Sequence, residues 1–209
     1  EMTSSLVGSE MCIRDSYWIR ECNIDGWRMD VGDEISHYFW KNFRRAVKAV
    51  KKDMLIIGEI WHYAGDFLEG DEWDTVMNYP FYLNLIDLLA DEKIQVSQFV
   101  QNLGYLKGRL NKKCYPLMWN LIDSHDTARF LHLCNENKKK QHLAAAFQLL
   151  LPGMPMIYYG DEFAMPGAND PDCRRGMYWD EEYQDKEMYE WYKPVSYTHL
   201  RAHETRRHL

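Results

Sequence analysis

The sequence predicts an α/β fold built on a parallel sheet, and three observations lead to that prediction. Short apolar stretches alternate along the chain with longer segments of helical periodicity, an order that is typical of parallel sheets. Residues 54–61 form a nearly continuous apolar run, as expected for a strand that is covered on both faces. No G-x-G-x-x-G motif follows any expected strand, so a dinucleotide-binding fold has no support. The sheet is therefore either open and doubly wound or part of a (β/α)8 barrel.

The first expected strand is DGWRMD, residues 25–30, in which Arg28 and Asp30 share one face. These residues alone fit two interpretations, a structural salt bridge and a functional site. Residues 35–53 predict an amphipathic helix with Ser36 as its cap, because apolar side chains recur there with helical spacing. The further expected elements are strands at 54–61, 74–79, 116–124 and 154–163, two helical segments at 81–111 and a helix at 128–150.

Composition limits the classes to which the protein can belong. With 209 residues, of which 46% are hydrophobic and 14% aromatic, the chain can bury a sizeable core and is not disordered. The formal charge of −7 argues against a nucleic-acid partner. No apolar run approaches the roughly 20 residues of a membrane helix. The cysteines contain no C-x-x-C pair, which argues against zinc and disulfide frameworks and favours the cytoplasm; they are Cys12, Cys22, Cys114, Cys134 and Cys173.

The two ends of the chain differ from the rest. Residues 1–16 and 194–209 lack sustained strand or helix periodicity, and both resemble translated adapter sequence. We therefore expect them to be non-native tails and exclude them from the fold. The stretch HETRRH at 203–208 does not have the spacing of a helical zinc site, because three residues separate its glutamate from the second histidine.

Three carboxylates follow the expected strands. Asp30 ends the first strand, Glu59 ends the second, and Asp126 lies beside His125 just beyond the fourth. Ligands of parallel α/β folds bind at the carboxyl ends of strands, so these acids are expected to converge on one pocket. Gathering like charges costs free energy, so the pattern indicates chemistry rather than a purely structural role.

The neighbours of the first two acids predict different protonation states. Arg28 on the same face favours a charged Asp30, as a nucleophile requires. Glu59 stands between Ile57-Gly58 and Ile60-Trp61, and an apolar surround favours the protonated form that a general acid requires. A charged and a protonated carboxyl facing one cleft form the working pair of retaining glycoside hydrolysis, with Asp126 adding negative charge near the transition state.

Three segments resemble ordered sequence blocks of the α-amylase family, glycoside hydrolase family 13. They are DGWRMDVGDEISH, IIGEIWH and NLIDSHDTARF. A later segment, YYGDEFAMPGANDPDCRRGMYWD, resembles the branch that contains neopullulanase, cyclomaltodextrinase and maltogenic amylase. The resemblance spans about residues 17–193 and implies a partial (β/α)8 TIM barrel, about strands 4 to 8, truncated at its N-terminal side.

The resemblance implies roles for individual residues. Asp30 would be the nucleophile, Glu59 the acid/base and Asp126 the transition-state stabiliser. Arg28 and His125 match positions that orient the nucleophile and bind sugar hydroxyls. The outer substrate positions are Trp61 and Tyr79 on the leaving-group side and Asp170 with Arg174 on the other side. For Trp61 and Tyr79, the alternative explanation is that the aromatic ring packs at the rim of a barrel. For Asp170 and Arg174, the alternative is an ordinary ion pair within a loop.

The chain departs from the family pattern in two places. The family's first block, an Asp…Asn-His stretch on the third strand, is missing. The sequence VGDE also has Gly32-Asp33 where Ala-Asn is more usual in the family. No cofactor and no metal are expected in this stretch, while calcium stays open for the complete enzyme. The expected partner is an α-glucan or maltooligosaccharide, with neither nucleic acid nor membrane, and a homodimer is one arrangement open to the complete protein.

The expected function is hydrolysis of α-1,4-glucosidic bonds in cyclomaltodextrins, pullulan or maltooligosaccharides by the full-length parent, with this stretch alone inactive. Two alternatives remain. One is an α-glucosidase or oligo-1,6-glucosidase of the same family, which would release glucose from chain ends only. The other is a non-catalytic, amylase-like binding protein. The retained acids argue against it, because such relatives lose them.

Overall fold

A computed structural model describes residues 14–207, with side chains placed for residues 14–197. Of the predicted tails, residues 14–16 and 194–207 lie within the described residues and are helical, the first in a helix at 14–22 and the second in α7 (Lys186–Arg207), whereas residues 1–13 and 208–209 lie outside them. The chain divides into two compact units, of which the first contains residues 14–77 and 107–118 and the second residues 78–106 and 119–207. Within residues 14–207 no helix is both long and apolar enough to cross a membrane.

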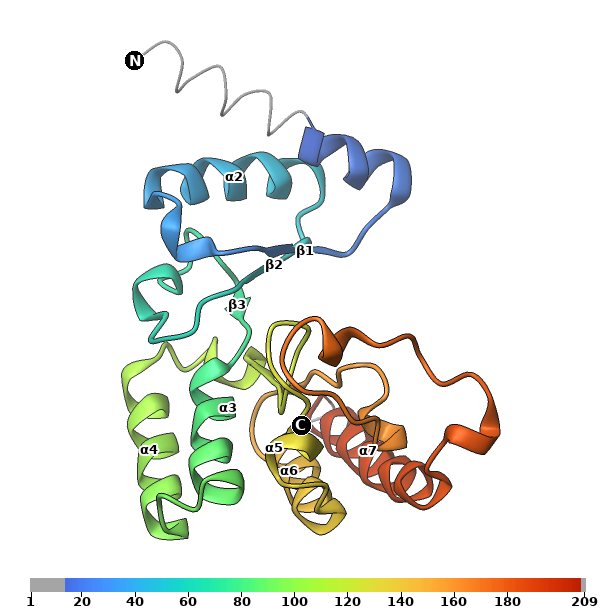
Figure 1. Ribbon diagram of the computed structural model, residues 1–209. Coiled ribbons are helices and arrows are strands. Elements are labelled where there is room, and N and C mark those ends of the chain that lie inside the picture. The colour runs from blue at the N-terminus through green and yellow to red at the C-terminus, as the bar shows by residue number, and fades with distance from the viewer. Residues whose placement is uncertain (1–13, 208–209) are drawn as a thin grey trace. The chain divides into compact units, whose positions relative to one another are not determined.

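The first unit contains a three-stranded parallel sheet with the order β1-β2-β3. Its elements are a helix at residues 14–22, β1 (Gly26–Met29), α2 (His37–Val50), β2 (Leu55–Gly58) and β3 (Thr75–Val76). Arg28 pairs in register with Ile57 and Met29 with Gly58, so β1 and β2 end side by side. The predicted strand–helix–strand order is confirmed, and Figure 1 shows α2 lying along the two strands that it connects.

Helix α2 forms where the sequence predicts it. The Ser36 hydroxyl accepts a hydrogen bond from the Phe39 N–H at 3.3 Å, which satisfies one of the free donors at the helix start. Trp40, Phe43 and Val47 bury the apolar face. The Trp40 indole also donates to the Gly32 carbonyl at 2.8 Å, which ties the helix to the turn that follows β1.

The second unit is mainly helical, and it contains a second parallel pair, β4 (Trp119–Asn120) with β5 (Met154–Pro155). Its helices are α3 (Tyr79–Leu85), a π-helical turn (Ile86–Ala90), α4 (Val96–Arg109), α5 (Phe130–Leu133), α6 (Lys138–Leu150) and α7 (Lys186–Arg207). The last turn of α4 belongs to the first unit. The two helical segments predicted at 81–111 are confirmed as α3 and α4, which lie side by side in Figure 1.

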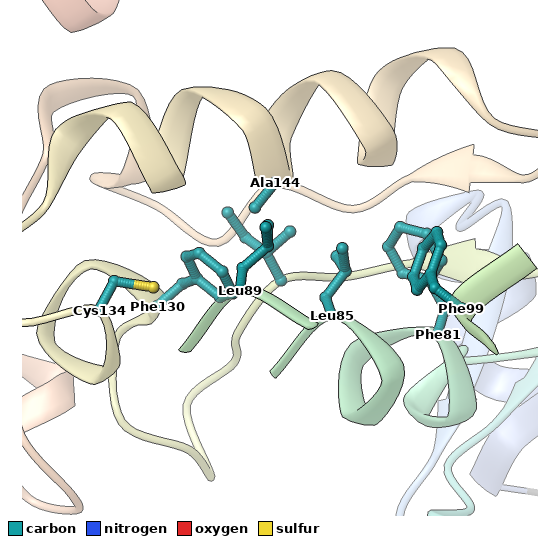
Figure 2. Packing of buried hydrophobic residues seen from close by; sticks show 8 residues of the cluster. Phe81, Leu85, Leu89, Phe99, Phe130, Cys134 and Ala144 are labelled. Carbon is teal, nitrogen blue, oxygen red and sulfur yellow. The ribbon is translucent and has the colours of Figure 1, made fainter. Parts of the chain in front are cut away.

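A hydrophobic cluster joins α3, α4, α5 and α6 within the second unit. Figure 2 shows its side chains, which are Phe81, Leu85, Leu89, Phe99, Ile122, Phe130, Cys134 and Ala144. A second cluster joins α5 and α6 to α7 through Leu131, Ala145, Leu149, Ala164, Met188 and Tyr192. Burial of these faces fixes the segment between β4 and α5, which carries His125 and Asp126.

The prediction of one continuous helix over 128–150 is wrong. The segment forms α5 and α6, and Asn135 and Glu136 between them have φ angles of 52° and 59°. These left-handed conformations cannot continue a right-handed helix. The Asn137 side chain then accepts from the backbone N–H of Lys139 and Lys140 and starts α6. The strand regions are also shorter than predicted, and 161–163 is a 3-10 turn rather than strand.

Candidate active site

Asp30 and Glu59 each follow directly on the last residue of a strand, and Arg28 contacts both. The Arg28 guanidinium donates a hydrogen bond from Nη1 to Asp30 Oδ1, and its Nη2 lies 2.9 Å from Glu59 Oε2. The parallel register of β1 and β2 produces this arrangement, because it aligns the ends of the two strands. The Asp30 side chain is 74% exposed while that of Glu59 is 6% exposed, so one acid faces solvent and the other is enclosed.

The surroundings of Glu59 are more polar than the sequence predicts. Besides Arg28, its carboxylate accepts from the Val31 N–H at 3.0 Å and from the Trp61 indole at 3.2 Å. The expectation of an apolar surround is therefore wrong, because it considered only neighbours in the sequence. These donors hold the Glu59 side chain in one orientation. Trp61, at 41% exposure, keeps an open aromatic surface beside the carboxyl group.

Val31 adopts a backbone conformation that is rare for a β-branched residue, with φ 44° and ψ 48°. This left-handed turn directs the Val31 N–H at Glu59, and the following Gly32 N–H donates to the Glu59 carbonyl at 3.1 Å. Strained residues of this kind concentrate at functional sites, where the surrounding structure holds them in place. Here the strained residue directly follows Asp30 and binds the second acid.

The Trp73 ring supports the backbone beside both acids. It is 1% exposed and stacks on Phe67 at 4.2 Å between ring centroids. A Cβ atom added at Gly32 or at Gly58 would overlap the ring, so both positions require glycine. The ring contact was not predicted from the sequence, although a glycine directly before Glu59 and another two residues after Asp30 are signals that a large group approaches the backbone there.

Replacing Gly58 by alanine is expected to destabilise the complete protein by about 1–3 kcal/mol, because the added methyl group displaces Trp73. Thermal unfolding of the variant and of the unsubstituted protein measures the effect. The control is Gly104→Ala, because a Cβ atom at Gly104 would meet open space; this variant should unfold at the same or a higher temperature. An unchanged unfolding midpoint for Gly58→Ala would contradict the prediction.

The second unit brings four other predicted residues together. Asp126 Oδ2 lies 3.0 Å from His125 Nε2, and Asp126 Oδ1 lies 3.2 Å from Arg174 Nη2. Arg174 also pairs with Asp170 at 2.7 Å and donates through Nε to the His125 carbonyl at 2.9 Å. The Asp170–Arg174 ion pair is thus present, and it is joined to Asp126 rather than isolated in its loop.

Tyr79 occupies a different kind of position from Trp61. It begins α3, is 0% exposed, and its hydroxyl lies 3.2 Å from Ser124 Oγ. Its ring packs against Tyr82 with edge-to-face geometry. This burial favours the packing alternative for Tyr79, whereas Trp61 is 41% exposed.

Two buried carboxyl groups in the second unit were not singled out by the sequence analysis. Asp123 and Asp161 are each 1% exposed, and their carboxyl groups are close enough for each to affect the pKa of the other. Burial raises the pKa of both, and for Asp161 the charge of Asp123 raises it further, well above the usual range. Asp123 Oδ1 and Asp161 Oδ2 have no hydrogen-bond partner among the described residues, and a proton on one of the two carboxyls would relieve the repulsion between them.

Replacing Asp161 by asparagine is expected to make stability less dependent on pH. The raised pKa means that the folded state holds a proton that the unfolded state releases, so stability falls as pH rises above about 4. Asparagine can still donate to Asp123 and accept from Arg129, but it does not titrate. Denaturant unfolding of the complete protein and the variant at about pH 5 and about pH 8 measures the difference. Equal losses of stability between these pH values would contradict the prediction.

The structure therefore places the predicted residues in two groups, one in each unit. The first group contains Arg28, Asp30, Glu59 and Trp61, and the second contains His125, Asp126, Asp170 and Arg174. Among residues 14–207 there is no cluster of three or more histidine, cysteine, aspartate or glutamate side chains that could hold a metal ion. Calcium binding by the complete protein stays a prediction. The cysteines described, Cys22, Cys114, Cys134 and Cys173, are free thiols.

Comparison with known proteins agrees with the fold. The family model described as the catalytic domain of alpha amylase matches residues 4–205. The chain belongs to the α-amylase family, and it forms part of a (β/α)8 barrel.

Within that family the relatives belong to the branch that the sequence resembles. The chain is 49% identical over 179 residues to a cyclomaltodextrinase of Thermoanaerobacter pseudethanolicus, and 46% identical over 179 residues to neopullulanase 2 of Thermoactinomyces vulgaris. These alignments cover 86% of this chain but 31% and 30% of the relatives, so the chain spans about a third of their length.

Solved structures give the same result. A cyclomaltodextrinase structure matches with a TM-score of 0.86 and 44% identity over 88% of this chain and 32% of that chain. A cyclic alpha-maltosyl-(1→6)-maltose hydrolase of Arthrobacter globiformis matches with a TM-score of 0.89 and 35% identity over 92% of this chain and 44% of its own.

Proposed function

We propose that the complete protein is a retaining α-glucan hydrolase. It cleaves α-1,4-glucosidic bonds in cyclomaltodextrins, pullulan or maltooligosaccharides through a covalent glycosyl-enzyme intermediate. The observation that carries the proposal is the Arg28 guanidinium, which contacts both Asp30 and Glu59 at the adjoining ends of β1 and β2. Two carboxyl groups held at neighbouring strand ends are the machinery that retaining hydrolysis needs.

The two acids have surroundings that suit different steps. Asp30 is open to solvent and is held by Arg28, so its oxygen can attack the anomeric carbon and form the covalent intermediate. Glu59 is enclosed and oriented by the Val31 N–H and the Trp61 indole, so it can protonate the leaving oxygen and then activate the incoming water. Transfer of one proton to the leaving group and recovery of one from water complete the cycle.

The remaining roles follow from the family resemblance and are part of the proposal. Asp126 stabilises the positive charge that develops on the sugar, and His125 binds sugar hydroxyls. Trp61 offers an aromatic surface to the leaving-group side, and Asp170 with Arg174 holds a sugar on the other side. The resemblance assigns Tyr79 to the leaving-group side as well, and its side chain is buried.

Assay of the complete protein, recovered from source DNA, tests the function. We expect it to hydrolyse cyclomaltodextrins, pullulan or starch, and the first product observed by NMR should keep the α-anomeric configuration. A β-anomer as first product would contradict the retaining mechanism. Glucose release from chain ends only would support the α-glucosidase alternative. No reaction with any of the three substrates would contradict the assignment to this branch.

Several further expectations stay predictions about the complete protein. These are cytoplasmic residence, a homodimer, and the non-native origin of residues 1–16 and 194–209. Sequencing the genomic locus tests the last of these. If both end segments are found in frame with the core, the prediction that they are non-native is wrong. The same sequence would supply the remainder of the barrel for the assays above.

A further inference from the structure

The segment that carries His125 and Asp126 is fixed at both of its ends. Asp123 precedes it and accepts a hydrogen bond from the Phe130 N–H through Oδ2 at 2.7 Å, which closes residues 123–130 into a loop. Arg129 stands at the far end of the same loop and is 1% exposed. Neither Asp123 nor Arg129 has a role in the chemistry proposed above.

We propose that Arg129, held by the buried Asp161, is a positioning residue that fixes the orientation of Asp126. The inference rests on the proposed function, because it concerns the acid that would stabilise the transition state. Two sets of contacts within the second unit carry it.

The first set joins the two ends of the loop through one side chain. Asp161 Oδ1 binds Arg129 Nη1 at 3.1 Å, and the carboxyl of Asp161 interacts electrostatically with that of Asp123 at the other end of the loop. Asp161 itself is fixed from α6, since its carbonyl accepts from Gln141 Nε2 at 2.9 Å. The loop ends are therefore tied to one another and to the helix layer.

The second set runs from Arg129 to the carboxylate of Asp126. The backbone N–H of Arg129 donates to the Gly167 carbonyl at 2.9 Å, and its side chain donates through Nε to the Cys173 carbonyl at 3.1 Å, so Arg129 holds both ends of the 167–173 segment. The next residue, Arg174, contacts Asp126 Oδ1 at 3.2 Å. Arg129 thus fixes the backbone from which the partner of Asp126 projects.

The energetics of the pair favour a positioning role over a stabilising one. Arg129 and Asp161 are both almost fully buried, and burying an ion pair costs desolvation free energy that the attraction between the charges does not always recover. Arg129 also donates to the Tyr159 carbonyl and stacks on the Tyr158 ring at 4.0 Å, so several contacts hold its guanidinium in one orientation. Such a rigid group is suited to holding a nearby catalytic segment within a few tenths of an ångström.

The test substitutes Arg129 by lysine in the complete protein. Lysine keeps the charge beside Asp161 but cannot donate to Cys173 and Tyr159 with fixed fork geometry. We expect kcat on a maltooligosaccharide to fall about 100-fold while KM stays within about threefold, because a misplaced Asp126 weakens transition-state stabilisation more than substrate binding. The matched control is Arg175→Gln, in the same loop, whose ion pair with Asp172 is exposed; its kcat should match that of the unsubstituted protein.

A second variant acts on the same contact without removing Arg129. A Cβ atom at Gly167 would lie 2.9 Å from the Asp172 carbonyl and 3.1 Å from Arg129 Cγ, so Gly167→Ala should also lower kcat. If Arg129→Lys does not fold, as judged by circular dichroism, Gly167→Ala decides the question. A folded Arg129→Lys with kcat within threefold of the unsubstituted protein overturns the inference, as does an equal loss in Arg175→Gln. An inactive unsubstituted protein overturns the proposed function, and the inference with it.

Discussion

Replacing Glu59 by glutamine in the complete protein is expected to lower kcat on a maltooligosaccharide by about 1,000-fold. Glutamine fills nearly the same volume, and its single carbonyl oxygen can still accept from the Val31 N–H, although the hydrogen bond from the Trp61 indole is lost because an amide nitrogen takes the place of the second oxygen. It cannot donate a proton to the leaving oxygen, and this lost proton transfer is the source of the effect. The measurement is reducing-sugar release at several substrate concentrations.

The substrate provides a sharper readout of the same variant. An aryl maltoside with a good leaving group needs little protonation, so Glu59→Gln should lose far less activity in the bond-breaking step with that substrate than with a maltooligosaccharide. The matched control is Glu69→Gln, an exposed glutamate of the same unit, which should behave as the unsubstituted protein. Equal losses on both substrates would argue that Glu59 has a structural role, and unchanged activity would remove it from the mechanism.

The positions of the acids could be predicted from the sequence because they depend on local patterns. Apolar strand segments end at Met29 and Gly58, and the acids directly after them lie at one edge of the sheet whatever the details of packing. The Ser36 cap is equally local, since it depends only on the first turn of α2. Each of these predictions needs a stretch of fewer than about 20 residues.

The features that the sequence analysis missed depend on contacts between distant segments. Two of the three polar donors around Glu59 come from Val31 and Arg28, which are 28 and 31 residues away along the chain and are brought close by strand pairing. The Asp161 partner of Arg129 lies 32 residues further along the chain, and no local period indicates it. The break between α5 and α6 was missed for another reason, because left-handed Asn135 and Glu136 follow a segment with helical spacing.

The 209 residues expressed alone are expected to have no measurable glycosidase activity and to be poorly soluble. β1, which positions Asp30, is an outer strand of the three-stranded sheet, whereas every strand of a closed (β/α)8 barrel has two neighbours. An outer strand exposes unpaired N–H and C=O groups, which favours association with other chains. Its position is also poorly fixed, and retaining hydrolysis requires two carboxyl groups held about 5 Å apart across the scissile bond. The chain further covers only 31% of a cyclomaltodextrinase relative, and we expect the remainder of the complete protein to contribute groups that bind sugar.

The experiment expresses this chain and the complete protein in parallel and assays both on an activated aryl maltoside. Sedimentation of the soluble fraction reports association, and the complete protein serves as the positive control for the assay. Contaminating activity is excluded by Asp30→Asn in the same 209-residue chain, which removes the proposed nucleophile but leaves the expression host unchanged. Turnover by the unsubstituted chain that Asp30→Asn abolishes would show that β1 is held well enough by β2 alone. In that case the Arg28 contacts to Asp30 and Glu59, rather than closure of the barrel, would be the feature that fixes the two acids.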